Sequence, residues 1–142
     1  MSDPAPSRSL SSDLIGSVFE AIGKQDIDGL LELFTEDARF EPLTGTRVES
    51  GGYSGHSGIR AYFEEMGDVW EEMIPYAREV QNFGDTAVVV GGCRVRGRGS
   101  GAESDTEMAW VYLLRDGKIA SHRAFSSAED AFEAAGVSED AA

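Results

Sequence analysis

ESDTEMAWVYLLRDGKIASHRAFSSAEDAFEAAG, residues 103–136, is the stretch in which local structure can be read most directly. Its Asp116-Gly117 pair favours the positive φ angles of a two-residue hairpin turn, and apolar runs flank the pair on both sides. Ser127 with Asp130 three residues later resembles a capping box, and Gly136 suits the end of the helix that such a box would start. The stretch therefore predicts two antiparallel strands, a tight turn and a short capped helix.

The register of this hairpin follows from counting outward from the turn, which places Arg115 opposite Lys118. Because side chains alternate along a strand, the same count predicts which residues share a face. One face is small-sided, and its members are the pairs Val111 with His122, Ala109 with Ala124 and Glu107 with Ser126, together with Leu113 and Ala120. The other face is bulky and carries Met108, Trp110, Tyr112, Leu114, Ile119 and Phe125. We expect the first face to leave room for a cavity and the second to pack against a broad surface.

Length and composition predict a single globular domain. The chain has 142 residues, of which 41% are hydrophobic, so it can bury a sizeable core. Residues 1–12 are rich in Pro and Ser and lack periodicity, which predicts a disordered tail. We expect the domain to span residues 13–137 and a second disordered tail to span residues 138–142.

The formal net charge of −14 argues against a nucleic-acid partner or an anionic membrane, because both attract basic surfaces. No apolar run has the length of a membrane span, and the first residues show neither the basic head nor the apolar core of a signal peptide. Cys93 has no second cysteine with which to form a disulfide or a zinc site, so it is expected to be a small buried residue in a reducing compartment. We expect a cytoplasmic protein.

The first half of the chain predicts three helices. Apolar residues at helical spacing run from Leu14 to Ile22, and Gly23 suits the end of that helix. Asp26 is the expected N-cap of a short second helix, followed by an extended piece over residues 38–41 and a strand over residues 46–49. The third helix is expected over residues 57–74, where the helical rhythm of apolar residues continues until Pro75.

The second half predicts an antiparallel sheet, because its strands are joined by short turns rich in Gly and Asp. The expected strands are residues 76–83, 86–98, 103–115 and 118–126. Helices followed by a long antiparallel meander are typical of the α+β class.

Several strings, taken in order, resemble the SnoaL-like branch of the nuclear-transport-factor-2-like superfamily, which is similar to ketosteroid isomerases and polyketide cyclases. They are AIGKQDIDGLLELFTEDARFEP (21–42), GYSGHSGIRAYFEEM (52–66), RVRGRGSG (94–101) and WVYLLRDGKIASHRAF (110–125) followed by EDAFEAAG. The resemblance implies a cone, in which a strongly curved antiparallel sheet wraps around three helices and encloses one apolar pocket, with a short C-terminal helix outside.

The same resemblance implies a small hydrophobic molecule as the partner. We expect its pocket to be lined by Val18, Ile22, Phe34, Phe63, Trp70, Ala109, Val111, Ala124 and Ser126. Members of the superfamily often form dimers by packing sheet against sheet. Bulk alone would place Trp110, Tyr112 and Phe125 in the core beneath the helices. The face that the resemblance turns toward the pocket is the other one, so we expect a homodimer through this bulky face instead.

The catalytic groups of the isomerases mostly do not carry over. The position of their tyrosine oxyanion donor is Val18 here, and the position of their protonated aspartate is Ala109. Without these donors nothing evident would hold a developing enolate oxygen, so steroid isomerisation is not expected. The position of their general base is Glu41 or Pro42, depending on the alignment.

His122 and Glu41 are the candidate catalytic residues. An imidazole can take and give a proton near neutral pH, and the predicted register points His122 into the cavity. The alternative is a histidine that hydrogen-bonds a neighbour and takes no part in chemistry, just as Glu41 can be an exposed carboxylate at a strand end. The sequence thus leaves two hypotheses: cofactor-free acid/base catalysis, or a non-catalytic ligand-binding or interaction module. No metal site and no cofactor are expected, because the two histidines lie in distant segments and the carboxylates are scattered.

Overall fold

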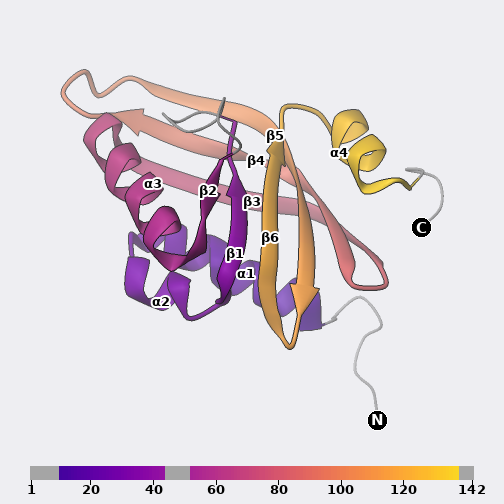
Figure 1. Ribbon diagram of the computed structural model, residues 1–142. Coiled ribbons are helices and arrows are strands. Elements are labelled where there is room, and N and C mark those ends of the chain that lie inside the picture. The colour runs from indigo at the N-terminus through magenta and orange to yellow at the C-terminus, as the bar shows by residue number, and fades with distance from the viewer. Residues whose placement is uncertain (1–9, 44–51, 138–142) are drawn as a thin grey trace, which may run out of the picture.

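A computed structural model describes residues 10–43 and 52–137 and shows a curved sheet with helices on both sides (Figure 1). The helices are α1 (Leu10–Lys24), α2 (Ile27–Leu31), α3 (Gly55–Val69) and α4 (Ala128–Ala135). The strands are β1 (Phe34–Glu41), β2 (Tyr53–Ser54), β3 (Trp70–Phe83), β4 (Thr86–Gly97), β5 (Glu103–Arg115) and β6 (Lys118–Phe125). The predicted α+β class is confirmed.

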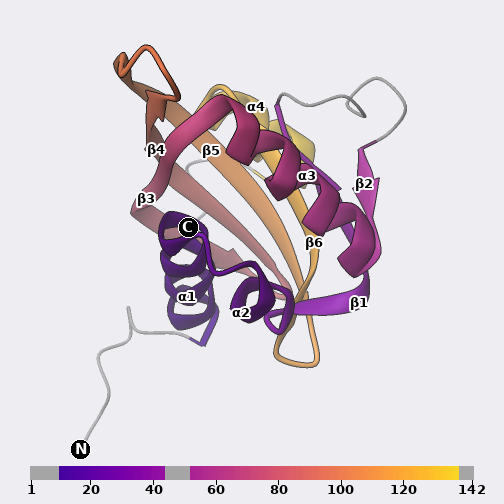
Figure 2. The ribbon, with the colours of Figure 1, turned by 90° about the vertical axis from the view of Figure 1, so that its left-hand side faces the viewer.

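The six strands form one sheet in the order β2-β1-β6-β5-β4-β3. Strands β3 to β6 make the predicted antiparallel meander, but β1 pairs with β6 in parallel, so the sheet is not wholly antiparallel. A parallel pair needs a long crossover connection, and here the whole of α3 and the meander lie between its two members. Figure 2 shows α1, α2 and α3 together on the concave side of the sheet and α4 on the other side.

The predicted helix caps and hairpin turn are confirmed. The Asp26 carboxylate accepts a hydrogen bond from the Gly29 amide at the start of α2, at 3.0 Å. The Ser127 hydroxyl accepts one from the Asp130 amide at the start of α4, and Gly136 ends that helix in the left-handed conformation. Asp116 and Gly117 have φ angles of 55° and 78°, as a two-residue hairpin turn requires.

The predicted end of the third helix is wrong. Helix α3 stops at Val69, and Trp70 already belongs to β3, which runs through Pro75 to Phe83. A strand can hold Pro75 because β3 is an edge of the sheet, where one side needs no ladder hydrogen bonds. The first helix, α1, begins at Leu10, inside the stretch of residues 1–12 predicted to be a tail.

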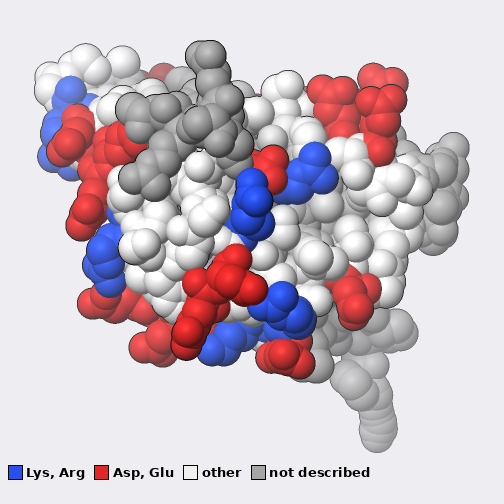
Figure 3. All heavy atoms as spheres, viewed as in Figure 1, with Lys and Arg blue, Asp and Glu red and all other residues white. Residues whose placement is uncertain are grey.

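The remaining predictions on residues 1–9, 46–49 and 138–142 lie outside the described residues. Within the described part, no helix is long and apolar enough to cross a membrane. Figure 3 shows acidic and basic side chains interspersed over the face seen in Figure 1, and the basic side chains on that face do not gather into one patch.

The predicted hairpin register is correct only next to the turn. Arg115 pairs with Lys118 and Leu114 with Ile119, but Ala120 then forms a β-bulge and has no residue opposite it. Beyond the bulge every pair shifts by one residue: Tyr112 lies opposite His122, Val111 opposite Arg123, Trp110 opposite Ala124 and Ala109 opposite Phe125. A shift of one residue exchanges the faces of one strand relative to the other, so His122 shares a face with Tyr112 rather than with Val111.

This register places the bulky residues under the helices. Trp110 and Tyr112 are 3% and 0% exposed, and the ring centroid of Phe19 in α1 lies 4.8 Å from that of Trp110. They belong to the main core between the concave face and α1 to α3. The predicted dimer interface through Trp110, Tyr112 and Phe125 is therefore wrong, because its two largest side chains are already buried within the chain.

The small side chains of β5 lie on the outer face instead. Ala109 and Val111 pack with Val88 of β4 against Ala131 and Phe132 of α4, and they form a second, smaller core. Phe125 is partly buried against this second core. Ala109 and Val111 were expected in the pocket, and the bulge at Ala120 is the reason that they are not there.

The curvature of the sheet depends on a close approach of two strands. A Cβ atom on Gly91 of β4 would lie 1.9 Å from the Tyr76 carbonyl oxygen of β3, which is too close for any other residue. The register of β3 against β4 shifts at the same level, between Ala77 and Glu79. Glycine and bulge together let β3 bend over β4, and this bend helps to form the concave side on which the helices pack.

Candidate functional site: an apolar pocket inside the cone

The concave side contains a cavity of about 240 Å³, which we call the cone pocket. Helix α3 supplies one wall through Tyr62, Phe63 and Met66, and the sheet supplies the opposite wall. The complete lining is Ile22, Phe40, Pro42, Leu43, Tyr62, Phe63, Met66, Trp70, Met73, Pro75, Cys93, Val95, Ser104, Thr106, Met108, Trp110 and Ala124. Most of these side chains are apolar or aromatic, as in sites that hold small organic molecules.

Strand β5 contributes two side chains with hydroxyl groups, Ser104 and Thr106, to the lining of the cone pocket. Ser104 and Thr106 are exposed, and their hydroxyl oxygens are 3.4 Å apart. Cys93 lies opposite Thr106 in the neighbouring strand, and burial raises the pKa of its thiol to about 11. The thiol therefore stays protonated at neutral pH and is a poor nucleophile.

The sequence-predicted pocket residues divide into two groups. Ile22, Phe63, Trp70 and Ala124 line the cone pocket. Val18 and Phe34 are fully buried in the main core and do not line it. Ala109 and Val111 lie on the outer face, and Ser126 is exposed just beyond the end of β6.

His122 lies behind the wall of the cone pocket. Its imidazole is 4% exposed and stacks on Phe40, with ring centroids 4.1 Å apart and an angle of 18° between the planes. Phe40 is itself a wall residue, so its ring separates the histidine from the cavity. The Tyr112 ring meets His122 edge to face at 5.0 Å. The histidine is thus enclosed by aromatic rings.

This environment makes His122 a weak base. Burial lowers the pKa of His122 to about 3, because the charged form would have no water around it. Neither Nδ1 of His122 nor the hydroxyl of Tyr112 has a hydrogen-bond partner among the described residues. At neutral pH the imidazole is neutral, and no described carboxylate stabilises its protonated form.

Glu41, the other candidate, lies on the opposite face of the sheet from His122. In the parallel pair of β1 and β6, Phe40 lies opposite His122, whereas Glu41 lies opposite Arg123. Oε1 of Glu41 is 3.8 Å from Nε of Arg123, and the Glu41 side chain is 43% exposed. The structure therefore does not bring the two candidate catalytic residues together.

Sequence reasoning missed the part of the pocket wall that β5 provides. Ser104, Thr106, Met108 and Trp110 occupy alternate positions of this strand, and all four line the cavity. The alternation of side chains along a strand predicts that these four residues share a face. A hairpin register without a bulge, however, predicts that this face lies outside the cone. Among residues 10–43 and 52–137, no group of three or more His, Cys, Asp or Glu side chains is placed to hold a metal ion.

Known proteins of solved structure share the fold of this chain. An NTF2-like protein of unknown function from Burkholderia pseudomallei K96243 has a TM-score of 0.73 at 20% identity, over 89% of this chain and 97% of that one. TerC co-crystallised with polyporic acid has a TM-score of 0.72 at 23% identity, over 88% and 97% of the two chains. Rv0760c from Mycobacterium tuberculosis in complex with estradiol-17β-hemisuccinate has a TM-score of 0.72 at 17% identity, over 84% and 95%. No curated protein matches the chain.

At these identities the solved structures establish the fold, and the sequence family is established separately. The family model described as the SnoaL-like domain matches residues 15–122, which include α2, α3, the five strands from β1 to β5 and His122 of β6. This match covers well over half of the chain, and the chain therefore belongs to the SnoaL-like domain family.

Proposed function

We propose that this protein binds a small, flat, apolar molecule in the cone pocket, with a hydroxyl or carbonyl group of the ligand at Ser104 and Thr106. The observation that carries the proposal is the cavity of about 240 Å³ with mostly apolar and aromatic walls and the hydroxyl groups of Ser104 and Thr106 in its lining. A dry cavity of about 150 Å³ is enough to hold benzene. The cone pocket therefore suits one substituted ring or two fused rings, and Met66, Met73 and Met108 in its wall can adapt to the shape of the ligand.

Relatives of the same fold support this ligand class. Solved structures of similar fold hold estradiol-17β-hemisuccinate in one case and polyporic acid in another, and a third is a computationally designed binder of 17-OHP. We infer that the cone of this chain takes a related kind of molecule, with a planar ring body of a size that its cavity of about 240 Å³ can hold.

The surroundings of His122 favour binding over acid/base catalysis by His122 and Glu41. A general base must be able to take a proton near the working pH, and the pKa of His122 is about 3. A general base must also reach the ligand, and the Phe40 ring lies between His122 and the cavity. Glu41 faces the other side of the sheet, beside Arg123. We therefore assign His122 a packing role behind the pocket wall.

The proposal is tested by filling the pocket. Ala124→Phe places a ring in the cavity, and Ala102→Phe, at an exposed turn residue, is the matched control. Planar probes of rising size, from indole and 2-naphthol to estradiol, are titrated calorimetrically and by thermal shift. We expect at least one probe to bind the wild type and the Ala102→Phe variant and to bind Ala124→Phe at least tenfold more weakly. Equal binding by all three proteins would contradict the proposal.

We also propose a homodimer, through the part of the outer sheet face that α4 does not cover. This part carries a basic and an acidic side chain on neighbouring strands, because Arg94 lies opposite Asp105. The Tyr76 hydroxyl donates to the Asp105 carboxylate at 2.7 Å. A surface with both charges can meet its own copy across a two-fold axis. Light scattering coupled to gel filtration tests this, with dimers expected for the wild type and monomers for Arg94→Glu.

A cytoplasmic location is part of the same proposal. It is supported by the one cysteine, Cys93, which is a free, buried thiol. Fractionation of native cells, followed by detection with a specific antibody, tests this location; recovery in the membrane or secreted fraction would contradict it.

A further inference from the structure

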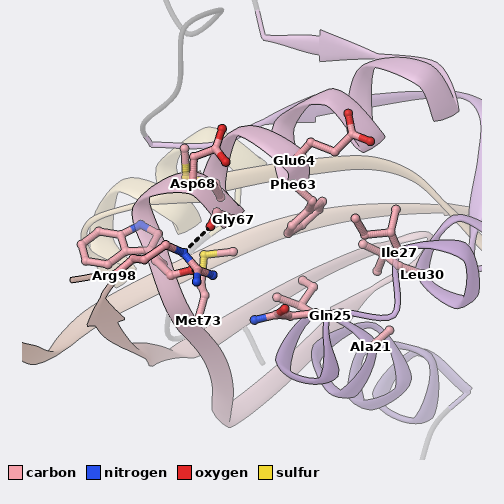
Figure 4. Close-up of a pocket in the computed structure, with 13 residues that line it drawn as sticks. Ala21, Gln25, Ile27, Leu30, Phe63, Glu64, Gly67, Asp68, Met73 and Arg98 are labelled. Atoms are coloured by element: carbon pink, nitrogen blue, oxygen red, sulfur yellow. Dashed lines mark hydrogen bonds between the residues drawn. The ribbon is translucent and has the colours of Figure 1, made fainter. Parts of the chain in front are cut away.

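A second and larger cavity lies between α1 and α2 on one side and the junction of α3 with β3 on the other (Figure 4). Its volume is about 460 Å³. It shares the side chains of Ile22, Phe63, Met66, Trp70 and Met73 with the cone pocket, so these five residues form the partition between the two cavities. Its remaining border includes four polar residues that do not line the cone pocket: Gln25, Glu64, Asp68 and Arg98.

Arg98 is held in place at this cavity by main-chain carbonyls. Its Nε donates to the Gly67 carbonyl at 2.9 Å, and its Nη2 donates to the Trp70 carbonyl at 3.4 Å. Its backbone amide donates to the Val69 carbonyl at 3.1 Å. These bonds tie the turn after β4 to the C-terminal end of α3. They also fix the guanidinium at the cavity border before any ligand arrives.

Some N–H groups of the Arg98 guanidinium remain available to a ligand. It has five N–H groups, and two of them donate to the Gly67 and Trp70 carbonyls. No carboxylate in residues 10–43 and 52–137 forms an ion pair with Arg98. Arg98 and Met73 both line the cavity, and the Arg98 side chain is exposed at its border. A ligand that suits this site has a hydrogen-bond acceptor for the guanidinium and an apolar part for the cavity.

The two acidic residues at this border face elsewhere. Glu64 and Asp68 are one turn apart on α3, and both are exposed. In Figure 4 their carboxylates point away from Phe63 and Met73, whose side chains face the cavity. Arg98 is therefore the cationic side chain of this lining, and the carboxylates of Glu64 and Asp68 extend from its border toward solvent.

We propose that this second cavity binds an apolar carboxylate of the medium-chain fatty acid type. The carboxylate lies on Arg98, because a guanidinium matches the two oxygens of a carboxylate with parallel hydrogen bonds. The hydrocarbon lies along the partition, where Phe63, Met66 and Met73 offer apolar and adaptable surface. This site goes beyond the cone pocket in position and in ligand charge, and it does not depend on a ligand in the cone pocket.

The head-group test uses decanoate, 1-decanol and decylamine, all below their critical micelle concentrations, with binding measured by calorimetry. The wild type is expected to bind decanoate about tenfold more tightly than decanol, since a charged hydrogen bond contributes that much or more. Arg98→Gln is expected to bring decanoate down to the affinity of decanol and to leave decanol unchanged. Arg115→Gln, at the exposed hairpin turn, removes the same charge elsewhere and should change neither. Unchanged decanoate binding by Arg98→Gln, or tighter binding of decylamine than of decanoate, would overturn the proposal.

The location test separates the two cavities. Ile27 borders only the second cavity, and Ala124 borders only the cone pocket. Ile27→Trp is expected to weaken decanoate binding at least tenfold, whereas Ala124→Phe is expected to leave it within twofold of the wild type. The reverse pattern would place the fatty acid in the cone pocket and overturn the assignment. Circular dichroism shows whether each variant is folded, and Arg98→Gln, at an exposed residue, keeps the proposal testable if Ile27→Trp does not fold.

Discussion

The ring of Phe40 lies flat on the imidazole of His122, with ring centroids 4.1 Å apart, and so joins the wall of the cone pocket to a buried titratable group behind it. The two residues are also direct neighbours in the parallel pairing of β1 with β6. One side of the Phe40 ring therefore faces the cavity, and the other side keeps His122 away from water.

Removal of that ring should expose His122 to the cavity. In Phe40→Ala we expect the pKa of His122 to rise from about 3 toward its ordinary value near 6.5, because water could then solvate the charged imidazole. We also expect a loss of about 3 to 5 kcal/mol in unfolding free energy from the cavity that is left. An NMR titration of the His122 ring protons gives the first value and chemical denaturation gives the second. A pKa that stays near 3 would show that Phe40 does not shield the histidine.

The unfolding free energy should depend on pH because His122 has different pKa values in the folded and unfolded chains. Its pKa is about 3 in the folded chain and near 6.5 in the unfolded chain, so between these values only the unfolded chain takes up the proton. The contribution of His122 to stability is therefore complete above pH 6.5 and falls as the pH drops toward 3, by up to about 1.4 kcal/mol per pH unit.

His122→Phe is the variant that isolates this effect, since it keeps a ring but cannot titrate. Denaturation curves of both proteins at several pH values between 4 and 8 give the difference in unfolding free energy. We expect this difference to be constant above pH 6.5 and to move in favour of the variant below it. Parallel curves at all pH values would mean that the histidine has the same pKa in both states.

The hydroxyl of Tyr112 is buried without a hydrogen-bond partner among the described residues, and its removal should not destabilise the fold. We expect Tyr112→Phe to leave the unfolding free energy unchanged or to raise it by up to about 1 kcal/mol, because the variant no longer desolvates an unpaired polar group. Tyr53→Phe is the matched comparison, since Tyr53 is equally buried but its hydroxyl donates to Glu65 at 2.7 Å. That variant should lose about 1.5 to 3 kcal/mol, because the acceptor is a carboxylate. A similar loss of unfolding free energy in Tyr112→Phe would show that the Tyr112 hydroxyl has a hydrogen-bond partner, contrary to this prediction.

Gly91 should tolerate no side chain. The Cβ of Gly91→Ala would meet the Tyr76 carbonyl oxygen at 1.9 Å, and a backbone atom in the bend between β3 and β4 cannot move aside cheaply. We expect a loss of at least about 3 kcal/mol, or failure to fold. Gly67→Ala in α3 is the control, because a Cβ there has no neighbour within 4 Å. It should be neutral or stabilising by up to about 1 kcal/mol in thermal or chemical denaturation.

The fold could be predicted from sequence wherever a local signal is strong. Asp26, Ser127 and Gly136 act as caps, and Asp116-Gly117 as a turn, through contacts within a few residues. The end of α3 could not be predicted in the same way. Trp70 and Met73 fit the helical rhythm, yet they also fit the start of a strand whose edge position, known only from the whole sheet, admits Pro75.

The site could be predicted only in part, because it depends on a bulge. Residues from helices, such as Ile22 and Phe63, were placed on the pocket wall by helical spacing and family resemblance alone. The unbroken register and the family resemblance place the residues of β5 on the wrong face, whereas the bulk of Trp110 and Tyr112 favours the buried face that they occupy. No residue type near Ala120 distinguishes a bulge from a regular strand. The low pKa of His122 likewise arises from Phe34, Phe40 and Tyr112, which come from two other strands.

The bulge at Ala120 decides which of two interleaved sets of side chains the end of β6 turns inward. With Ala120 in place, His122 and Ala124 point under the helices and Arg123 points outward. A strand shorter by this one residue would present the other set and would have to bury the charge of Arg123. The interior of this scaffold can thus acquire a different chemistry through the insertion or deletion of one residue in a strand. No other residue of the sequence has to be substituted.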